Sequence, residues 1–172
     1  MSAKWYKEQP RNRNFLNPIG YLLKLEKFDG VDFFCQTANI PDLTMPTTEV
    51  SSRFRSLPIV SGGGVSFGDF VVRFIVDEDL KNYYAIHNWM RDQGNSDQMQ
   101  RSTSEIDYSG AQLHIVTSAY NPAFIVDFKN IFPVSLSGVQ FDATMTDVEY
   151  ITAEVVFKHQ EFYIRDKNLR PL

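Results

Sequence analysis

The sequence contains a single cysteine, Cys35, so no disulfide can form within the 172-residue chain. It therefore gives no argument for secretion, and a reducing compartment suits it. No run approaches the roughly eighteen apolar residues that span a membrane. The N-terminal residues also lack the apolar segment of a signal peptide. We expect neither a membrane protein nor a disulfide-stabilised secreted domain.

Patterns that would carry catalysis or metal binding are also scarce. No pair of the three histidines has zinc-like spacing or a nearby cysteine; they are His87, His114 and His159. The acidic run 77–79 is interpreted as a helix start, because consecutive residues there point in different directions. The glycine run 62–64 lacks the Lys-Ser/Thr of a phosphate-binding loop and is interpreted as a hairpin joint. We expect no enzyme activity, no metal and no cofactor.

Aromatic residues are abundant instead, at 14% of the chain, and such residues are enriched in strands and interfaces. Asp29-Gly30 lies between two apolar runs and predicts a hairpin. The last run is unusually long for a strand, which suits pairing with a neighbouring subunit. Apolar and polar alternation predicts strands at 21–28, 31–38, 70–76, 111–117, 124–131 and 150–164, and two short strands within 47–60 around a polar tip at 51–56.

One segment has helical periodicity, at about 78–93, with Asp77 as the expected N-cap. Strands, one helix and then strands predict a mainly β fold, an antiparallel sandwich or barrel with one flanking helix. The predicted organisation is an N-terminal arm at 1–18, one β domain at 19–165 and a C-terminal tail at 166–172.

Charge is spread unevenly along the chain. Residues 1–13 carry +3 and residues 158–172 carry +2, which leaves −9 for the residues between them out of a total of −4. Basic ends could dock onto the acidic body of another copy, or they could be solvated tails. The tip sequence Arg53-Phe54-Arg55 places an aromatic side chain between two cations. This favours a protein contact, with nucleic-acid binding together with Tyr108 as the alternative.

Several segments, in order, resemble the tail tube proteins of contractile-tailed bacteriophages, which are related to bacterial secretion-system tube proteins. They cover most of residues 14–164. The segments are NFLNPIGY at 14–21, FCQTANIP at 34–41, FGDFVVRFIVDED at 67–79 leading into IHNWM at 86–90, and FKNIFP at 128–133 ahead of a long terminal strand.

The resemblance implies a structural subunit that forms hexameric rings, which stack into the inner tube through which DNA is ejected into the host. Its partners would be further copies, the tail sheath, and the baseplate and tape-measure proteins. It would belong to the virion and be assembled in the host cytoplasm. A specialised ring at the baseplate or tail terminator is the alternative, because both ends of the chain extend past the shared segments.

The resemblance also suggests roles for particular residues. An acidic lumen would repel DNA and let it pass without specific binding, and Glu49, Asp69 and Glu154 are the candidate lining residues. The resemblance implies a long hairpin at about 44–60. This hairpin and the N-terminal arm would make contacts between subunits and between rings. The residues expected there are Arg53, Phe54, Arg55, Leu57, Lys4, Trp5, Arg11 and Arg13.

Overall fold

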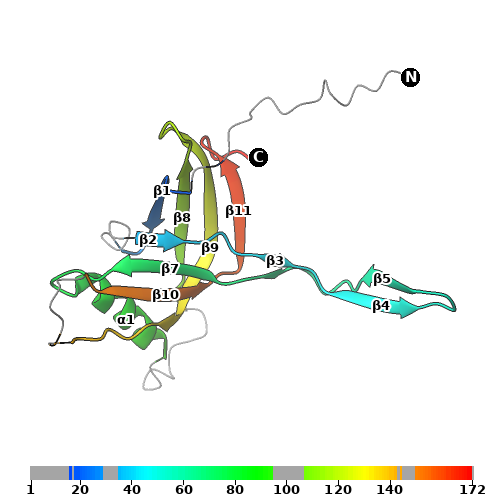
Figure 1. The fold of residues 1–172 in the computed structure, drawn as a ribbon, viewed down its shortest axis with the longest axis horizontal. Coiled ribbons are helices and arrows are strands. Elements are labelled where there is room, and N and C mark those ends of the chain that lie inside the picture. The colour runs from blue at the N-terminus through cyan, green and yellow to red at the C-terminus, as the bar shows by residue number, and fades with distance from the viewer. Residues whose placement is uncertain are drawn as a thin grey trace.

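The computed structural model describes residues 16, 18–28, 35–94, 107–142, 144 and 150–171 (Figure 1). It confirms a mainly β, antiparallel fold with one flanking helix, α1 (Lys81–Gly94). The strands are β1 (Tyr21–Leu25), β2 (Cys35–Ala38), β3 (Leu43–Thr44), β4 (Thr47–Ser51), β5 (Ser56–Val60), β6 (Ser66–Phe67), β7 (Phe70–Ile75), β8 (Ser109–Val116), β9 (Pro122–Leu136), β10 (Thr152–Lys158) and β11 (Glu161–Asp166).

The body consists of two layers that share the 15-residue strand β9. The strand order is β1-β8-β9-β10-β7-β2, and β11 also pairs with β9. The first part of β9 pairs with β8 and β11, whereas residues 132–136 pair with β10. Figure 1 shows β1, β8 and β11 crossing the direction of β2, β7 and β10. One strand thus turns from the first layer into the second.

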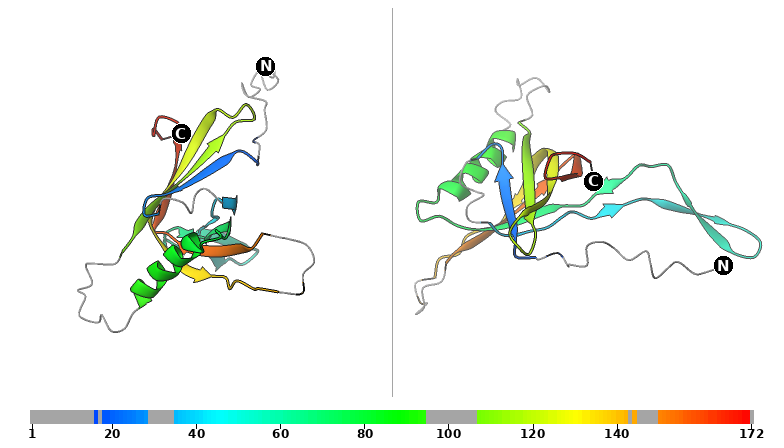
Figure 2. Two further views of the ribbon diagram at one scale, coloured as in Figure 1. Left: turned by 90° about the vertical axis from the view of Figure 1, so that its left-hand side faces the viewer. Right: turned by 90° about the horizontal axis from the view of Figure 1, so that it is seen from above.

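The core lies between these layers, where alternate residues of each strand point inward. The rings of Phe70 and Phe128 stack at its centre with their centroids 4.3 Å apart. Helix α1 adds Ile86 and Trp89 to the same buried cluster, on the side of the molecule away from the projecting β4–β5 hairpin (Figures 1 and 2). Each such large side chain contributes about 1.5–3 kcal/mol when fully buried.

The helix begins later than the sequence predicted, at Lys81. Leu80, just before it, has a left-handed backbone with φ of 57°. Asp77 is not the N-cap. Its backbone N–H instead donates to Oδ1 of Asn82 at 3.1 Å, and Asn82 donates from Nδ2 to the carbonyl of Ile75 at 2.8 Å. A side chain inside the helix therefore ties its start to the end of β7.

The long terminal strand predicted at 150–164 is two strands. The chain leaves β10 at Lys158 and begins β11 at Glu161, which lies in the other layer. The alternation changes phase at this point, because Val155 and Phe157 are buried in β10 whereas Phe162 packs on the core from β11. A continuous strand would have turned Phe162 outward. The longest strand of the fold is β9.

The hairpin predicted around Asp29-Gly30 is also wrong as a strand pairing. The turn itself falls outside the described residues. β1 pairs with β8 and β2 pairs with β7, so the two strands lie at opposite ends of the strand order. Among the described residues no ladder joins them, and the layers do not close into a barrel within one chain. A turn sequence predicts that the chain reverses direction, but it does not predict which strand the following segment pairs with.

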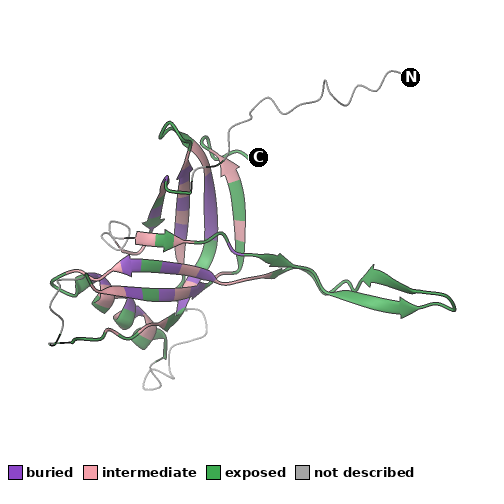
Figure 3. Ribbon diagram, viewed as in Figure 1, coloured by how far each residue is buried: buried purple, intermediate pink, exposed green. Residues whose placement is uncertain are grey.

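The long hairpin predicted at 44–60 is confirmed. In strands β4 and β5, Thr47 lies opposite Val60 at one end and Ser51 lies opposite Ser56 at the other. The short pair of strands β3 and β6 connects them to the body. We call residues 43–67 the arm. Figure 3 shows that the arm projects from the body and is exposed along nearly its whole length.

We expect Phe128→Ala to lower the free energy of unfolding by about 3–5 kcal/mol, because it opens a cavity beside Phe70. Phe54→Ala, at the exposed tip of the arm, should change it by less than about 0.5 kcal/mol. Urea unfolding at a protein concentration that keeps the chain monomeric measures both values. Equal losses for the two variants would contradict the assignment of the core.

Candidate assembly surfaces

The outer part of the arm is an amphipathic two-stranded ribbon. Val50 lies opposite Leu57 and Thr48 lies opposite Ile59, so these four side chains share one face. Its three aliphatic side chains are between 39% and 49% exposed. A two-stranded ribbon is marginally stable alone and gains stability when its apolar face is covered. Within the described residues, nothing covers this face.

The opposite face of the ribbon is more polar. It carries Glu49, whose carboxylate accepts a hydrogen bond from the hydroxyl of Ser56 at 2.9 Å. The turn between the strands is closed by the N–H of Ser52, which donates to the carbonyl of Arg55 at 2.9 Å. The ribbon therefore has a defined register and two chemically different faces.

The tip presents the aromatic side chain expected from the sequence. Phe54 is 90% exposed, and the guanidinium of Arg53 lies 5.7 Å from the centre of its ring. The structure brings the predicted contact residues Arg53, Phe54, Arg55 and Leu57 together at this end of the arm. It does not bring Tyr108 to them, since Tyr108 directly precedes β8 in the body.

The base of the arm is fixed to the body by polar contacts. The side chain of Asn39 donates to the carbonyl of Asp69 at 3.0 Å and accepts from the N–H of Val71 at 2.7 Å. The N–H of Gly68 donates to the carbonyl of Asp42 at 2.9 Å. These bonds hold the segment that follows β2 beside the segment that precedes β7, at the point where the arm joins the body.

His159 lies beside this base, where the chain passes from β10 to β11. Its ring centroid is 5.6 Å from that of Phe67, 5.3 Å from Phe128 and 5.6 Å from Phe162. Both ring nitrogens are buried without a hydrogen-bond partner in the described part of the chain. Burial lowers the pKa of His159, and Asp69 partly opposes this effect. The neutral imidazole thus packs as part of the aromatic cluster.

The candidate lumen residues do not share one surface. Glu49 is on the arm. Asp69 precedes β7 and forms an ion pair with Lys158. Glu154 lies opposite Arg73 on the exposed face of the second layer. Their role as lumen lining stays a prediction, as does the role of Lys4, Trp5, Arg11 and Arg13, which lie outside the described residues.

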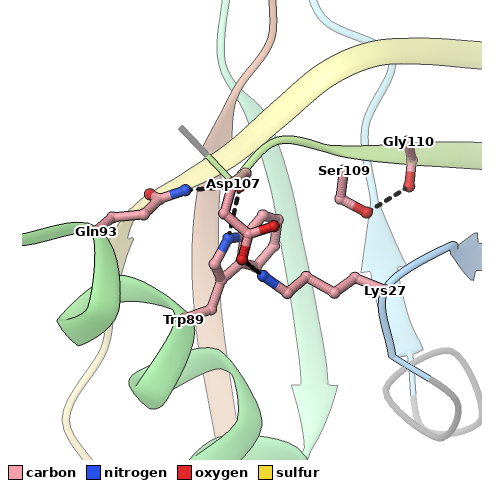
Figure 4. A network of polar contacts seen from close by, with 6 residues as sticks. All are labelled: Lys27, Trp89, Gln93, Asp107, Ser109 and Gly110. Carbon is pink, nitrogen blue, oxygen red and sulfur yellow. Dashed lines mark hydrogen bonds and ion pairs between the residues drawn. The ribbon is translucent and has the colours of Figure 1, made fainter. Parts of the chain in front are cut away.

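Sequence reasoning missed a polar clamp between the helix and the sheet (Figure 4). The carbonyl of Asp107 accepts hydrogen bonds from Nε1 of Trp89 and Nε2 of Gln93, both at 2.9 Å. Its carboxylate pairs with Lys27, whose ammonium lies 4.8 Å from the Trp89 ring centroid. Burial lowers the pKa of Lys27, and Asp92 partly opposes this shift. No local signal links residues so far apart in sequence.

A cavity of about 500 Å³ opens beside this clamp. It is lined by Glu26, Lys27, Asp107, Tyr108, Ser109, Gly110, Lys129 and Asn130. Two of its cations are already paired, Lys27 with Asp107 and Lys129 with Asp127 at 3.3 Å. No group of three potential metal ligands occurs among the described residues. Spanning a membrane would take a longer or more apolar helix than the described residues contain.

Strand edges form the second candidate assembly surface. β1 and β2 each pair along one side only within the described chain, and the free side of β11 carries just an isolated bridge between Arg165 and Pro171. The first two approach each other, and the thiol of Cys35 lies close enough to the hydroxyl of Tyr21 to affect its pKa. Burial, reinforced by the thiol, raises the pKa of Tyr21 to about 12. Exposed edges of this kind are templates for pairing with another chain.

A comparison with family models identifies the family. A family model described as phage tail tube protein matches residues 8–165. Curated protein sequences give no match. The family match covers most of the chain and confirms the resemblance stated from the sequence.

Solved structures show the same fold at low sequence identity. A chain of the anti-feeding prophage cap, described as a tube terminating cap, aligns with a TM-score of 0.67 and 14% identity over 93% of this chain and 97% of that one. A chain of the PVC sheath–tube complex of an extracellular contractile injection system in the extended state gives 0.63 and 12% over 96% and 99%. A crystal structure of an Hcp protein gives 0.55 and 8% over 87% and 94%.

The buried imidazole predicts a pH dependence of stability. Unfolded His159 takes up a proton below its ordinary pKa of about 6.5, whereas the folded side chain does so only at lower pH. The free energy of unfolding should therefore fall as pH drops from about 6.5 toward the lowered folded value. Denaturant unfolding between about pH 5 and pH 7.5 measures this slope.

His159→Phe should reduce that slope, since it removes the titrating group and keeps an aromatic ring among the three phenylalanines. Part of the slope should remain, because burial also lowers the pKa of His114. His87→Gln, on the exposed side of the helix, is the matched control and should leave the slope as it is. An unchanged slope in His159→Phe would refute the assignment.

Proposed function

The chain belongs to the phage tail tube protein family, and from this membership we propose that it is a structural subunit of a phage tail tube. Its copies would form hexameric rings that stack into the inner tube through which DNA is ejected into the host. The family describes a tube subunit, so the prediction of a structural protein and not an enzyme is confirmed. Within the molecule, the observation that supports assembly is the uncovered apolar face of the arm.

Open strand edges support ring formation. Each layer of the body ends in a strand that is unpaired along one side within the described residues, and pairing such edges between copies would satisfy their N–H and C=O groups. The paired edges would belong to different strands, so the contact is head-to-tail and generates a closed ring when the rotation allows it. Ring closure would also remove edges that otherwise favour aggregation.

The proposed partners follow from the family and from the similar structures. A relative by fold comes from a sheath–tube complex, which supports a sheath as a partner of this chain. The particle would be a virion or a related injection system, assembled in the host cytoplasm, with baseplate and tape-measure proteins as further partners. A specialised ring is the second candidate, because the similar folds include chains of a terminating cap and of a baseplate.

DNA would pass through the lumen without specific binding. Glu49, Asp69 and Glu154 remain the proposed acidic lining residues. The purified protein should show no affinity for single- or double-stranded DNA at low salt in a fluorescence anisotropy titration. Binding that weakens steeply with added salt would support the nucleic-acid-binding alternative instead.

The ribbon face yields a direct test of assembly. Wild-type protein should form rings or tubes in negative-stain electron micrographs and sediment faster than a monomer. Leu57→Asp combined with Ile59→Asp places charge on the apolar face and should abolish assembly while leaving the circular dichroism spectrum of the body unchanged. Thr47→Asp, on the other face of the ribbon, should assemble nearly as well as wild type.

A wild-type chain that stays monomeric at every concentration and salt tested would refute the proposed function. Equal assembly by wild type and the Leu57→Asp, Ile59→Asp variant would show that the ribbon face takes no part in assembly.

A further inference from the structure

Several exposed side chains follow the end of β7 and precede the start of β10, at the end of the body away from the arm (Figure 1). The N–H of Val76 donates to the carbonyl of Ile151 at 2.8 Å, which holds the residues after β7 beside those before β10. The side chains of Tyr84 and Tyr150 are 61% and 67% exposed there. We call Glu78, Asp79, Leu80, Tyr84 and Tyr150 the turn surface.

Leu80 has an unusual backbone conformation, which it shares with Tyr120, Asn130 and Leu169. Its φ of 57° is left-handed, a conformation that leucine seldom adopts, and its side chain is 39% exposed. The carbonyl of Leu80 accepts the first helical hydrogen bond from the N–H of Tyr84 at 2.9 Å. Residues held in such sparsely populated conformations occur often at functional sites. An exposed leucine and tyrosine are thereby presented from the start of a rigid helix.

The charges of the turn surface are opposite to those of the arm tip. Glu78 and Asp79 are exposed, and Lys81 pairs with Asp79. The tip carries Arg53 and Arg55 with no acidic residue between them. Complementary charge gives such a contact its orientation and its rate of association. Each surface also offers aromatic or aliphatic side chains that a partner would cover.

The positions of the two surfaces suit association in one direction. Figure 1 places the arm at one end of the long axis and the turn between β7 and α1 at the other. Between its base and its tip the arm extends roughly 35 Å, at about 3.3 Å per strand residue. Each copy therefore has the arm at one end and the turn surface at the other. When the arm of one copy binds the turn surface of the next, one arm and one turn surface stay free, so further copies can be added in a row.

We propose that the arm of one copy docks on the turn surface of another copy, with Arg53 and Arg55 facing Glu78 and Asp79. The inference rests on the proposed function and adds the acceptor site for the arm. The aliphatic face of the ribbon and the ring of Phe54 cover the exposed side chains of Leu80, Tyr84 and Tyr150.

Charge reversal on each side tests the contact. Arg53→Glu with Arg55→Glu, or Glu78→Lys with Asp79→Lys, should raise the concentration for half-maximal assembly by about tenfold or more, measured by sedimentation. All four substitutions together restore opposite charges and should bring this concentration back toward the wild-type value. Arg91→Glu with Lys167→Glu, two exposed cations elsewhere, is the matched control and should assemble like wild type.

Two further measurements separate the possible outcomes. Circular dichroism and thermal melting establish that each variant is folded, and the neutral pairs Arg53→Gln with Arg55→Gln and Glu78→Gln with Asp79→Asn should give weaker effects of the same sign. Suppose that wild type assembles and that the charge-reversed pairs assemble equally well, or that the fourfold variant assembles no better than the pairs. Either result would overturn the docking contact and leave the proposed tube subunit unaffected. A monomeric wild type would overturn the proposed function itself.

Discussion

The passage of β9 through both layers is the constraint on which the rest of the fold depends. Its first part pairs with β8 and β11 and its last residues pair with β10. The two layers therefore share one strand, and the core lies between them on the inner side of its turn. Phe128 in β9 and Phe70 in β7 stack across that space. The chain leaves the body for the arm after β2 and returns into β7, so the base of the arm is set by the position of these two paired strands.

The body is well packed, whereas the candidate assembly surfaces are left uncovered in a single copy. Buried side chains fill the space between the layers and under the helix. The arm, in contrast, exposes aliphatic side chains on one face of a ribbon, and the outer strands leave backbone groups unpaired within the described residues. An isolated chain gains nothing from either feature, because exposed apolar surface and open edges favour association. Both become favourable once identical copies cover them, which fits a structural role better than a chemical one.

The aromatic cluster at the base of the arm connects these two parts. Phe67 belongs to the arm, His159 to the crossing between the layers, and Phe162 to the strand that follows. The ion pair between Asp69 and Lys158 lies at the same place. The neutral imidazole is tolerated there because its ring packs as an aromatic group.

The sequence by itself determined most of the strand segments, the single helix, the arm with its exposed Phe54, and the family, but it merged β10 with β11 and missed β3 and β6. Those features depend on local periodicity, turn residues and ordered short motifs. Only the tertiary structure decided the partners of the strands, the break at His159, the helix start at Lys81 and the clamp of Asp107 on Trp89. Each of these depends on contacts between residues far apart in the chain. Local alternation cannot encode such contacts, since a strand with one buried face fits more than one neighbour until the whole core is formed.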